Sequence, residues 1–388
     1  MSERIALVER MRAFGTTIFA EMSALAVQTG SVNLGQGFPD VDGPPALLDA
    51  ARDALYDGKH NQYPPGPGIP ELRAAVAAHQ QRFYGLAFDP ADEILVTAGA
   101  TEAIAATLLG LCEAGDEVVT FEPYYDSYAA CIALSGANRR VVTLRRDEQR
   151  WVFDPAELRA AITGRTRLIL LNTPHNPTGK VFDAAELQLI ADLAIEHDLT
   201  VVTDEVYEHL VFDGQHIPIA TLPGMRERTL TISSAGKTFS VTGWKIGWLC
   251  GPAPLVNAAR TVKQFLTYVN GGPFQPAVAT ALSFDDDYYR GVLDTLRLQR
   301  DTLVAGLLAA GFDMVVPQAT YFATADVAVD GVAFCRELPW RYGIVAIPSS
   351  VFYDSADGDR YVRFAFCKKV PVLNEALHRL GGGERGGT

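Results

Sequence analysis

Two lysines stand eight residues apart among small, hydroxyl-bearing and apolar side chains. Lys237 follows Ser234 and Gly236, and Lys245 precedes Gly247. A lysine amine attacks an aldehyde only in its neutral form, and removal from water together with a nearby positive charge lowers its pKa. A second cation and a hydroxyl suit a phosphate group. An arbitrary lysine is most often a solvated surface residue. Because the residues between these two lysines carry no charge, the segment indicates a site for an aldehyde that also bears a phosphate.

Pyridoxal phosphate (PLP) has that chemistry, and its other requirements can be sought along the chain. Gly99, Ala100 and Thr101 follow an apolar run and open a helical pattern, so backbone N–H groups there could face a phosphate. Asp204 ends the apolar run 199–203, where a carboxylate could hold a protonated pyridine nitrogen at the ligand-binding edge of a sheet. A plain glycine connection and a helix N-cap are the ordinary explanations of these two features.

Three further kinds of side chain complete the set of candidates. Tyr207 and Asn176 could donate to the ring oxygen of the cofactor, although Asn176 lies in a turn of Asn, Pro and Gly that needs no function. Tyr125 is our choice for stacking on the pyridine ring, with Tyr124 as the second choice; aromatic core residues are the ordinary explanation. Arg363 interrupts an apolar strand and could form a planar pair with a substrate carboxylate. Its neighbours do not decide which face of the strand it occupies.

The composition argues against several classes of protein. The chain has 388 residues, of which 48% are hydrophobic, and a formal net charge of -13, which argues against a nucleic-acid-binding surface. The five cysteines are scattered, without a CxxC pair or a zinc-ligand spacing, so we expect free thiols and no metal. The N-terminal residues lack a signal-peptide pattern, and no apolar stretch reaches membrane-spanning length. We therefore expect a soluble, cytoplasmic protein.

Short apolar runs alternate with helical patterns along most of the chain, which is typical of a parallel sheet with crossover helices. Seven strands are expected at 94–98, 117–122, 140–144, 168–172, 200–204, 229–233 and 246–250. Helices are expected at 101–111, 125–134, 184–197, 255–268 and from the acidic stretch 285–287 towards residue 310. Residues 46–285 should form a large domain, and residues 1–45 with 286–388 an N-terminal arm and a smaller α+β domain.

These segments together resemble the class I/II aminotransferases of PLP fold type I. The resemblance covers nearly the whole chain and rests on the segments 33–40, 61–68, 99–102, 175–179, 204–207 and 233–237. Within that group the chain most resembles the kynurenine/glutamine transaminase branch and the bacterial N-succinyldiaminopimelate aminotransferases. The resemblance implies an α/β fold: a mostly parallel seven-stranded sheet between helices in the large domain, with a smaller α+β domain beside it.

The resemblance also implies a catalytic or cofactor-binding role for each candidate. Lys237 would be the Schiff-base lysine and proton carrier, and Asp204 would hold the pyridine nitrogen. Tyr207 and Asn176 would contact the ring oxygen, and Tyr125 would stack on the ring. The phosphate would be bound by the helix start and by the lysine segment, through Gly99, Ala100, Thr101, Ser234 and Lys245. Many relatives have arginine at the position of Lys245, so bidentate contact with the phosphate is lost here.

For the substrate, the resemblance implies that Arg363 binds the α-carboxylate beside Asn176 and that Gly37 and Phe38 lie over the substrate. Tyr63 would reach the phosphate of a neighbouring subunit, which implies a homodimer with active sites at the interface. Several aromatic residues suggest a pocket for bulky or apolar side chains: Tyr321, Phe19, Phe38, Tyr124 and Phe274.

The implied activity is a ping-pong transamination between an L-amino acid and a 2-oxo acid. The candidate substrates are kynurenine-like, glutamine-like or methionine-like amino acids and N-succinyldiaminopimelate. A carbon–sulfur β-lyase would use the same lysine, but it would release ammonia and need no acceptor. A non-catalytic PLP-binding regulator is disfavoured because the catalytic positions are filled. A nicotinamide dehydrogenase is disfavoured because no strand precedes a GxGxxG segment.

Overall fold

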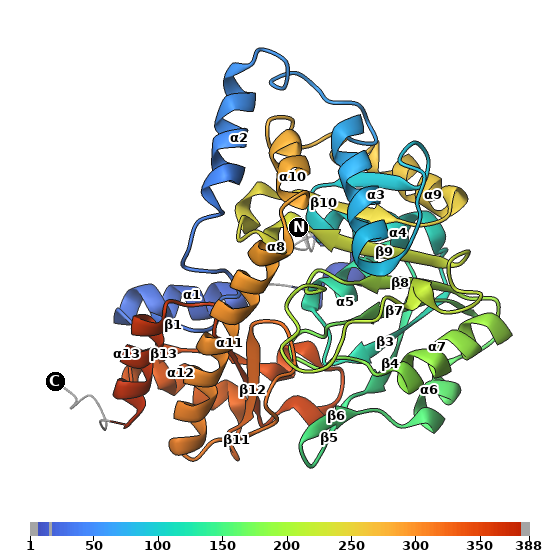
Figure 1. Ribbon diagram of the computed structural model, residues 1–388. Coiled ribbons are helices and arrows are strands. Elements are labelled where there is room, and N and C mark those ends of the chain that lie inside the picture. Colours follow the sequence, from blue (N-terminus) through green and yellow to red (C-terminus); the bar gives the residue numbers. More distant parts are fainter. Residues whose placement is uncertain (1–6, 15–17, 382–388) are drawn as a thin grey trace, which may run out of the picture.

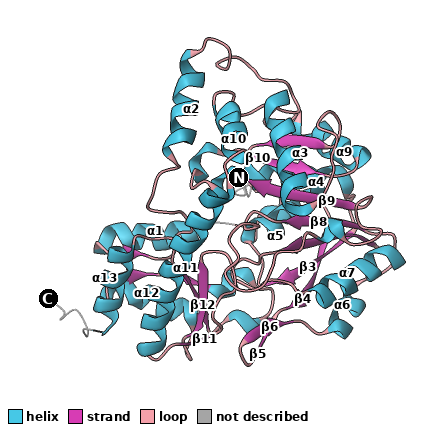
Figure 2. Cartoon of the chain, in the orientation of Figure 1, coloured by secondary structure: helices cyan, strands magenta, loops and turns pink. Residues whose placement is uncertain are grey.

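The computed structural model describes residues 7–14 and 18–381 of the chain (Figures 1 and 2). Its central feature is a seven-stranded sheet in the order β2-β10-β9-β8-β7-β3-β4. All neighbours in this sheet are parallel except β10, which runs antiparallel to both β2 and β9. The strands are β2 Ile94–Thr97, β3 Glu117–Glu122, β4 Asn138–Thr143, β7 Thr166–Asn172, β8 Thr200–Asp204, β9 Thr229–Ser234 and β10 Gly247–Cys250.

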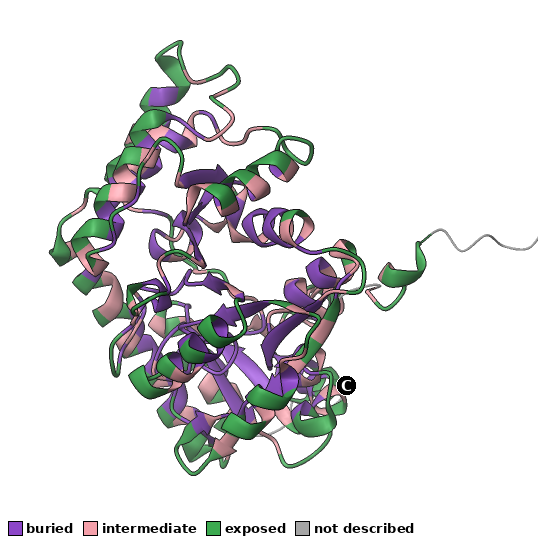
Figure 3. Ribbon diagram, turned by 90° about the vertical axis from the view of Figure 1, so that its right-hand side faces the viewer, coloured by how far each residue is buried: buried purple, intermediate pink, exposed green. Residues whose placement is uncertain are grey.

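Helices cover both faces of this sheet, which is why its middle strands are apolar on both sides (Figure 3). One face packs against α4 Gly99–Leu111, α5 Asp126–Ser135 and α9 Ala253–Lys263. On the other face, α6 Pro155–Ala161 and α7 Ala184–Glu196 cover the β3, β7 and β8 side. The β2 and β10 side is covered there by α2 Pro45–Tyr56, α3 Pro70–Tyr84 and α10 Phe274–Leu282. A short hairpin, β5 Arg145–Asp147 with β6 Arg150–Val152, follows β4.

A second, smaller group of elements contains a four-stranded sheet in the order β11-β12-β15-β14. Its strands are β11 Asp313–Met314, β12 Phe322–Asp326, β14 Ile347–Pro348 and β15 Tyr361–Ala365. The helices are α11 Asp286–Ala309, α12 Gly331–Arg341 and α13 Val370–Gly381. The N-terminal elements α1 Ile18–Thr29 and β1 Val32–Asn33 join this group, because β1 pairs in parallel with β13 Ile344–Val345.

The fold class predicted from the sequence is confirmed: the seven expected strands are the seven strands of the large sheet, with bounds shifted by two residues at most. The helix expected at 255–268 ends earlier, at Lys263, and Tyr268 adopts a left-handed backbone with φ 64°. The domain boundaries at 45 and 285 stay a prediction. None of the described helices is both long and apolar enough to cross a lipid bilayer.

Candidate active site

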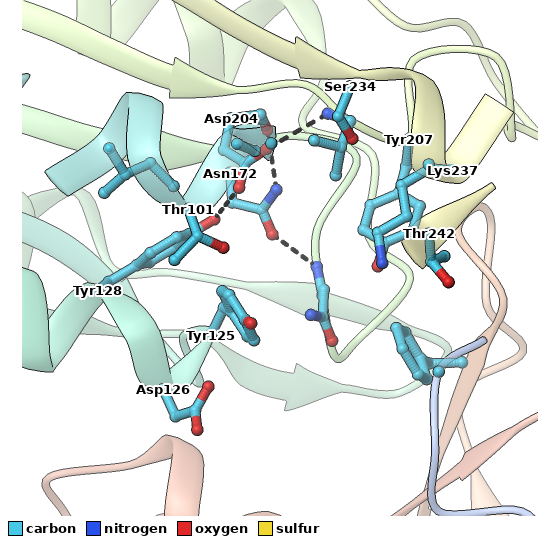
Figure 4. A pocket seen from close by; sticks show the side chains of 18 of the residues that line it. Thr101, Tyr125, Asp126, Tyr128, Asn172, Asp204, Tyr207, Ser234, Lys237 and Thr242 are labelled. Carbon is cyan, nitrogen blue, oxygen red and sulfur yellow. Dashed lines mark hydrogen bonds between the residues drawn. The ribbon is translucent and has the colours of Figure 1, made fainter. Parts of the chain in front are cut away.

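A cavity of about 360 Å³ lies at the carboxyl ends of the parallel strands (Figure 4). Strand ends at this edge carry the side chains that a ligand meets in open α/β sheets. Twelve of the residues named as candidates from the sequence line this cavity: Gly37, Gly99, Ala100, Thr101, Tyr125, Asn176, Asp204, Tyr207, Ser234, Lys237, Lys245 and Arg363. Residues that are far apart in the sequence therefore meet in one space.

Lys237 stands on the short helix α8 Ala235–Thr238, directly after β9. Removal from water lowers its pKa to about 8, and the charges of Arg363 and Lys245 act in the same direction. Its Nζ donates to the Tyr321 hydroxyl at 2.9 Å, and that hydroxyl donates to the Gly37 carbonyl at 2.7 Å. Tyr321 therefore holds the amine in place, a contact that its sequence position did not reveal.

Asp204 ends β8 and is buried at the inner end of the cavity. Burial raises the pKa of its carboxyl to about 6, while hydrogen bonds oppose that rise. The Tyr128 hydroxyl donates to Oδ2 at 2.6 Å, and the Val206 backbone N–H donates to Oδ1 at 3.3 Å. Tyr128 was missed as a site residue, because a fully buried tyrosine on α5 looks like core in a sequence. Its position three residues after Tyr125, on the same helical face, was the available signal.

The loop after β7 is held by Asn172, another residue that sequence reasoning left without a role. Asn172 Nδ2 donates to the Asp204 carbonyl at 2.8 Å, and its Oδ1 accepts from the Asn176 backbone N–H at 2.8 Å. This side chain links the ends of β7 and β8 and fixes Asn176 in the cavity wall. Tyr207 lies in the turn after β8, where burial raises the pKa of its phenol and keeps it a hydrogen-bond donor.

Arg363 points inward from β15, which settles the face that the sequence left open. Its Nη1 donates to Asn176 Oδ1 at 3.2 Å, and its Nη2 donates to the Gly35 carbonyl at 3.1 Å. Its guanidinium carbon lies 4.0 Å from the ring centre of Phe322 and 5.4 Å from that of Phe19. Nε has no partner among the described residues, and burial lowers the guanidinium pKa to about 10. The side chain is a buried cation with a free donor.

The segments at Gly99 and Lys245 lie against each other in the wall of the same cavity and form a cradle. Gly99 opens α4 with φ +74°, and a Cβ atom there would lie 3.1 Å from Lys245 Nζ. Gly247 lies still closer, because a Cβ atom at that position would lie 2.6 Å from the Gly99 carbonyl carbon and 2.9 Å from the Ala100 nitrogen. The absence of a side chain at Gly99 and Gly247 thus allows β10, the N-terminus of α4 and Lys245 to pack closely together. Ser234 and Thr101 line the same space.

Other candidates lie outside the residues that line this cavity. Tyr63 is 81% exposed and contacts Tyr268 edge to face, and Phe38 packs over the Lys368 ammonium, 4.5 Å from its ring centre. Tyr124 points away and donates to Asp354 Oδ1 at 2.6 Å, so of the two adjacent tyrosines it is Tyr125 that faces the cavity.

The expected aromatic pocket is assembled only in part. Phe19 lines the cavity and Tyr321 contacts Lys237, whereas Phe274 instead stacks on Trp244 at a ring-centre distance of 4.6 Å. Phe322 adds an aromatic wall that was not expected.

Comparison of the chain with protein-family models identifies the family to which it belongs. The model of the aminotransferases of class I and II matches residues 29–380, which is most of the chain. The chain belongs to this family. It is a PLP-dependent aminotransferase that moves an amino group between an amino acid and a 2-oxo acid, as the sequence predicted.

Curated relatives match along nearly their whole length. The chain is 52% identical to a Mycobacterium tuberculosis protein named "Probable N-succinyldiaminopimelate aminotransferase", over 96% of this chain and 97% of the relative. It is 40% identical to methionine aminotransferase of Escherichia coli, over 96% and 97% of the two chains. It is 38% identical to kynurenine–oxoglutarate transaminase of Dictyostelium discoideum, over 95% and 94%.

The solved structures agree with these matches. N-succinyldiaminopimelate aminotransferase from Mycobacterium tuberculosis superposes with a TM-score of 0.95 at 53% identity, covering 97% of this chain and 100% of that chain.

The cavity of this aminotransferase fits PLP by the chemistry of its groups. It offers a neutralisable amine at Lys237, a buried carboxylate at Asp204 and two further cations, Lys245 and Arg363, in a chain of net charge -13. The cradle at Gly99 combines a helix N-terminus, a hydroxyl and an ammonium group, which together suit a phosphate.

Replacing Gly247 by Ala is expected to weaken PLP binding about 10- to 100-fold, because the new Cβ displaces the start of α4 and with it at least one charge-assisted hydrogen bond. Titration of the cofactor-free protein with PLP, followed by absorbance, measures the dissociation constant. Gly243→Ala is the matched control, since a Cβ atom there meets nothing within 4 Å. Equal dissociation constants for the two variants would contradict the proposed phosphate cradle.

Replacing Tyr128 by Phe is expected to lower kcat/KM about 10- to 100-fold, because a hydrogen bond to a buried charge is lost. Without this donor the pKa of Asp204 rises further, so the acid limb of the pH profile should move to higher pH. Tyr124→Phe is the control, because Tyr124 bonds Asp354 outside the cavity. An unshifted acid limb in Tyr128→Phe would show that this hydrogen bond does not tune the site.

Proposed function

We propose that the amino donor or acceptor of this aminotransferase is N-succinyldiaminopimelate or its oxo acid. The observation that carries the proposal is the identity of 52% to the Mycobacterium tuberculosis relative along nearly both whole chains. The methionine and kynurenine relatives are 40% and 38% identical, and they define the competing substrate class. Phe19 and Phe322 in the cavity wall are the residues that favour that second class.

The roles of the individual residues are part of the proposal. When bound, PLP supplies an electron sink for the bonds at the α-carbon of the substrate. Lys237 takes up and returns the α-proton, because an amine with a pKa near 8 exchanges protons readily around neutral pH. Arg363 binds the α-carboxylate through its free Nε and its Nη groups, and so orients the α-carbon toward Lys237.

The remaining cavity residues hold the cofactor. Asp204, supported by Tyr128, pairs with the pyridine nitrogen, and Asn176 and Tyr207 donate to the ring oxygen. Tyr125 covers one face of the ring. The phosphate is bound by the backbone and side chains of the cradle: Gly99, Ala100, Thr101, Ser234 and Lys245. Gly37 closes the substrate side through the contact between its carbonyl and Tyr321, and Phe38 covers the entrance.

A long substrate needs room beyond the cavity that holds the cofactor. A second cavity of about 390 Å³ shares Lys237 with the first and has Tyr321 and Cys367 in its wall. Its lining combines apolar side chains with the carboxyl groups of Asp40, Asp42 and Asp287, and the exposed Lys369 is at its rim. We place the methylene chain of the substrate along this second cavity and a distal carboxylate near Lys369.

Assayed with 2-oxoglutarate as partner, N-succinyldiaminopimelate is expected to give a kcat/KM about 2- to 5-fold above that of methionine, kynurenine or glutamine, because an ion pair between its distal carboxylate and an exposed lysine contributes roughly 0.5–1 kcal/mol. Lys369→Gln should raise KM for N-succinyldiaminopimelate and leave KM for methionine unchanged. A preference for methionine or kynurenine would replace the proposed substrate by the second class. Release of ammonia without an acceptor would identify a β-lyase activity.

We also propose that two chains share their active sites in a homodimer. Tyr63 projects from the surface beside Tyr268. Phe265, which is 80% exposed, and Tyr56 are further large apolar side chains left on the surface of one chain. Large apolar side chains that stay exposed on one chain are often covered at interfaces between chains. In the dimer, Tyr63 would complete the phosphate cradle of the neighbouring subunit.

Mixing inactive Lys237→Ala with weakened Tyr63→Phe subunits is expected to restore activity. In each mixed dimer one site combines an intact Lys237 with an intact Tyr63 from the other chain, so about a quarter of all sites become complete after random reassortment. Activity is measured before and after the subunits exchange. No gain over the summed activities of the separate variants would contradict the shared site.

A further inference from the structure

A second cluster of chemically active side chains lies buried outside the cofactor cavity. It consists of His79 on α3 and of Glu208 and His209 in the turn after β8. Each residue offers a nitrogen or oxygen atom, and these atoms all lie within 4.8 Å of one another. His79 Nε2 and His209 Nε2 are 2.7 Å apart. This cluster could not be predicted from the sequence, because 130 positions separate the two histidines.

The polar atoms of this cluster are not all satisfied by the protein. Glu208 Oε1 accepts from the Ser233 hydroxyl at 2.6 Å, and Oε2 has no well-formed hydrogen bond among the described residues, although the Tyr84 hydroxyl lies beside this carboxyl. His79 Nδ1 also lacks a partner there, and the exposed fractions of His79 and Glu208 are only 2% and 5%. Leaving a buried carboxylate oxygen unpaired is costly. A bound cation would satisfy Glu208 directly.

We propose that His79, Glu208 and His209 bind one divalent transition-metal ion of the zinc type. Two imidazole nitrogens and a carboxylate oxygen form a ligand set that Zn²⁺ accepts. Zn–N bonds of about 2.0 Å place tetrahedral ligands about 3.3 Å apart. The two rings must therefore separate by about half an ångström from their hydrogen-bonded distance of 2.7 Å. His209 is partly exposed, which leaves an entry path and room for a non-protein fourth ligand.

The charged groups around the cluster are compatible with a bound cation. Glu205 adds a buried carboxylate on the same turn and pairs with His216 at 2.8 Å. The opposing charge is Arg82, which packs over Phe83 and is itself bonded to Asp286 and to the Phe284 carbonyl.

The test uses the untagged full-length protein with PLP bound, first depleted of metal with a chelator. Titration with Zn²⁺, or with Co²⁺ followed by its visible d–d bands, should show one equivalent bound per chain and a rise in Tm. Crystals of the Zn²⁺-loaded protein should give an anomalous peak between His79 and His209. Glu208→Gln and His209→Asn should weaken metal binding about 100-fold or more. The control His197→Asn, an exposed histidine outside the cluster, should bind metal normally.

Two outcomes would overturn the proposal. The first is an absence of bound metal and of the anomalous peak in the unaltered protein. The cluster would then be only a hydrogen-bonded pair of histidines beside Glu208. This measurement does not depend on whether the variants fold. The second is loss of the metal in Lys237→Ala, which would place the ion at the cofactor instead. Neither outcome concerns the substrate of the transamination, so the proposed substrate would stand.

Discussion

The burial of Asp204 is the constraint on which the active site depends. A carboxyl whose pKa rises to about 6 on burial makes the ionised form less stable in the folded protein than in water, by about 2–3 kcal/mol at neutral pH. The direction of the effect follows from the raised pKa: the cost is present above that pKa and vanishes below the unfolded value. The hydrogen bonds from Tyr128 and the Val206 backbone are already included in that pKa and keep the cost from being larger. A cationic ring nitrogen beside Asp204 would offset this cost. Part of the free energy lost on burying the ionised carboxyl would therefore be regained when the cofactor binds.

Lys237 is the complement of this carboxylate. Its pKa falls for the same reason that the pKa of Asp204 rises, because both groups lose water where the strands end. The attraction between the two charges limits both shifts. Neither group is paired directly with the other: Asp204 bonds to Tyr128, and Lys237 bonds to Tyr321. Separate partners keep the two charges apart and leave the space between them for a ligand that touches both.

Much of the large domain could be predicted because parallel strands buried on both faces are nearly continuous apolar runs, and because functional residues follow directly after them. Asp204 and Asn176 were found by that rule, whereas Lys237 was found from its uncharged neighbours and its spacing from Lys245. The antiparallel direction of β10 could not be predicted, since nothing in the run 246–250 distinguishes a parallel from an antiparallel strand. The inward face of Arg363 depends on how β15 packs, which its neighbours in sequence do not reveal.

The turn after β8 shows why some site residues escape sequence reasoning. Asp204 and Tyr207 face the cofactor cavity, while Glu208 and His209 face α3 on its other side. Backbone bonds from Glu205 to Ile232 and from Glu208 to Glu205 fix the turn to the sheet. Because one rigid turn carries both groups, a bond made at Glu208 also restrains Tyr207. Adjacent residues of this turn therefore contribute to two different sites, the cofactor cavity and the cluster beside α3. Only the folded structure shows which side chain faces which site.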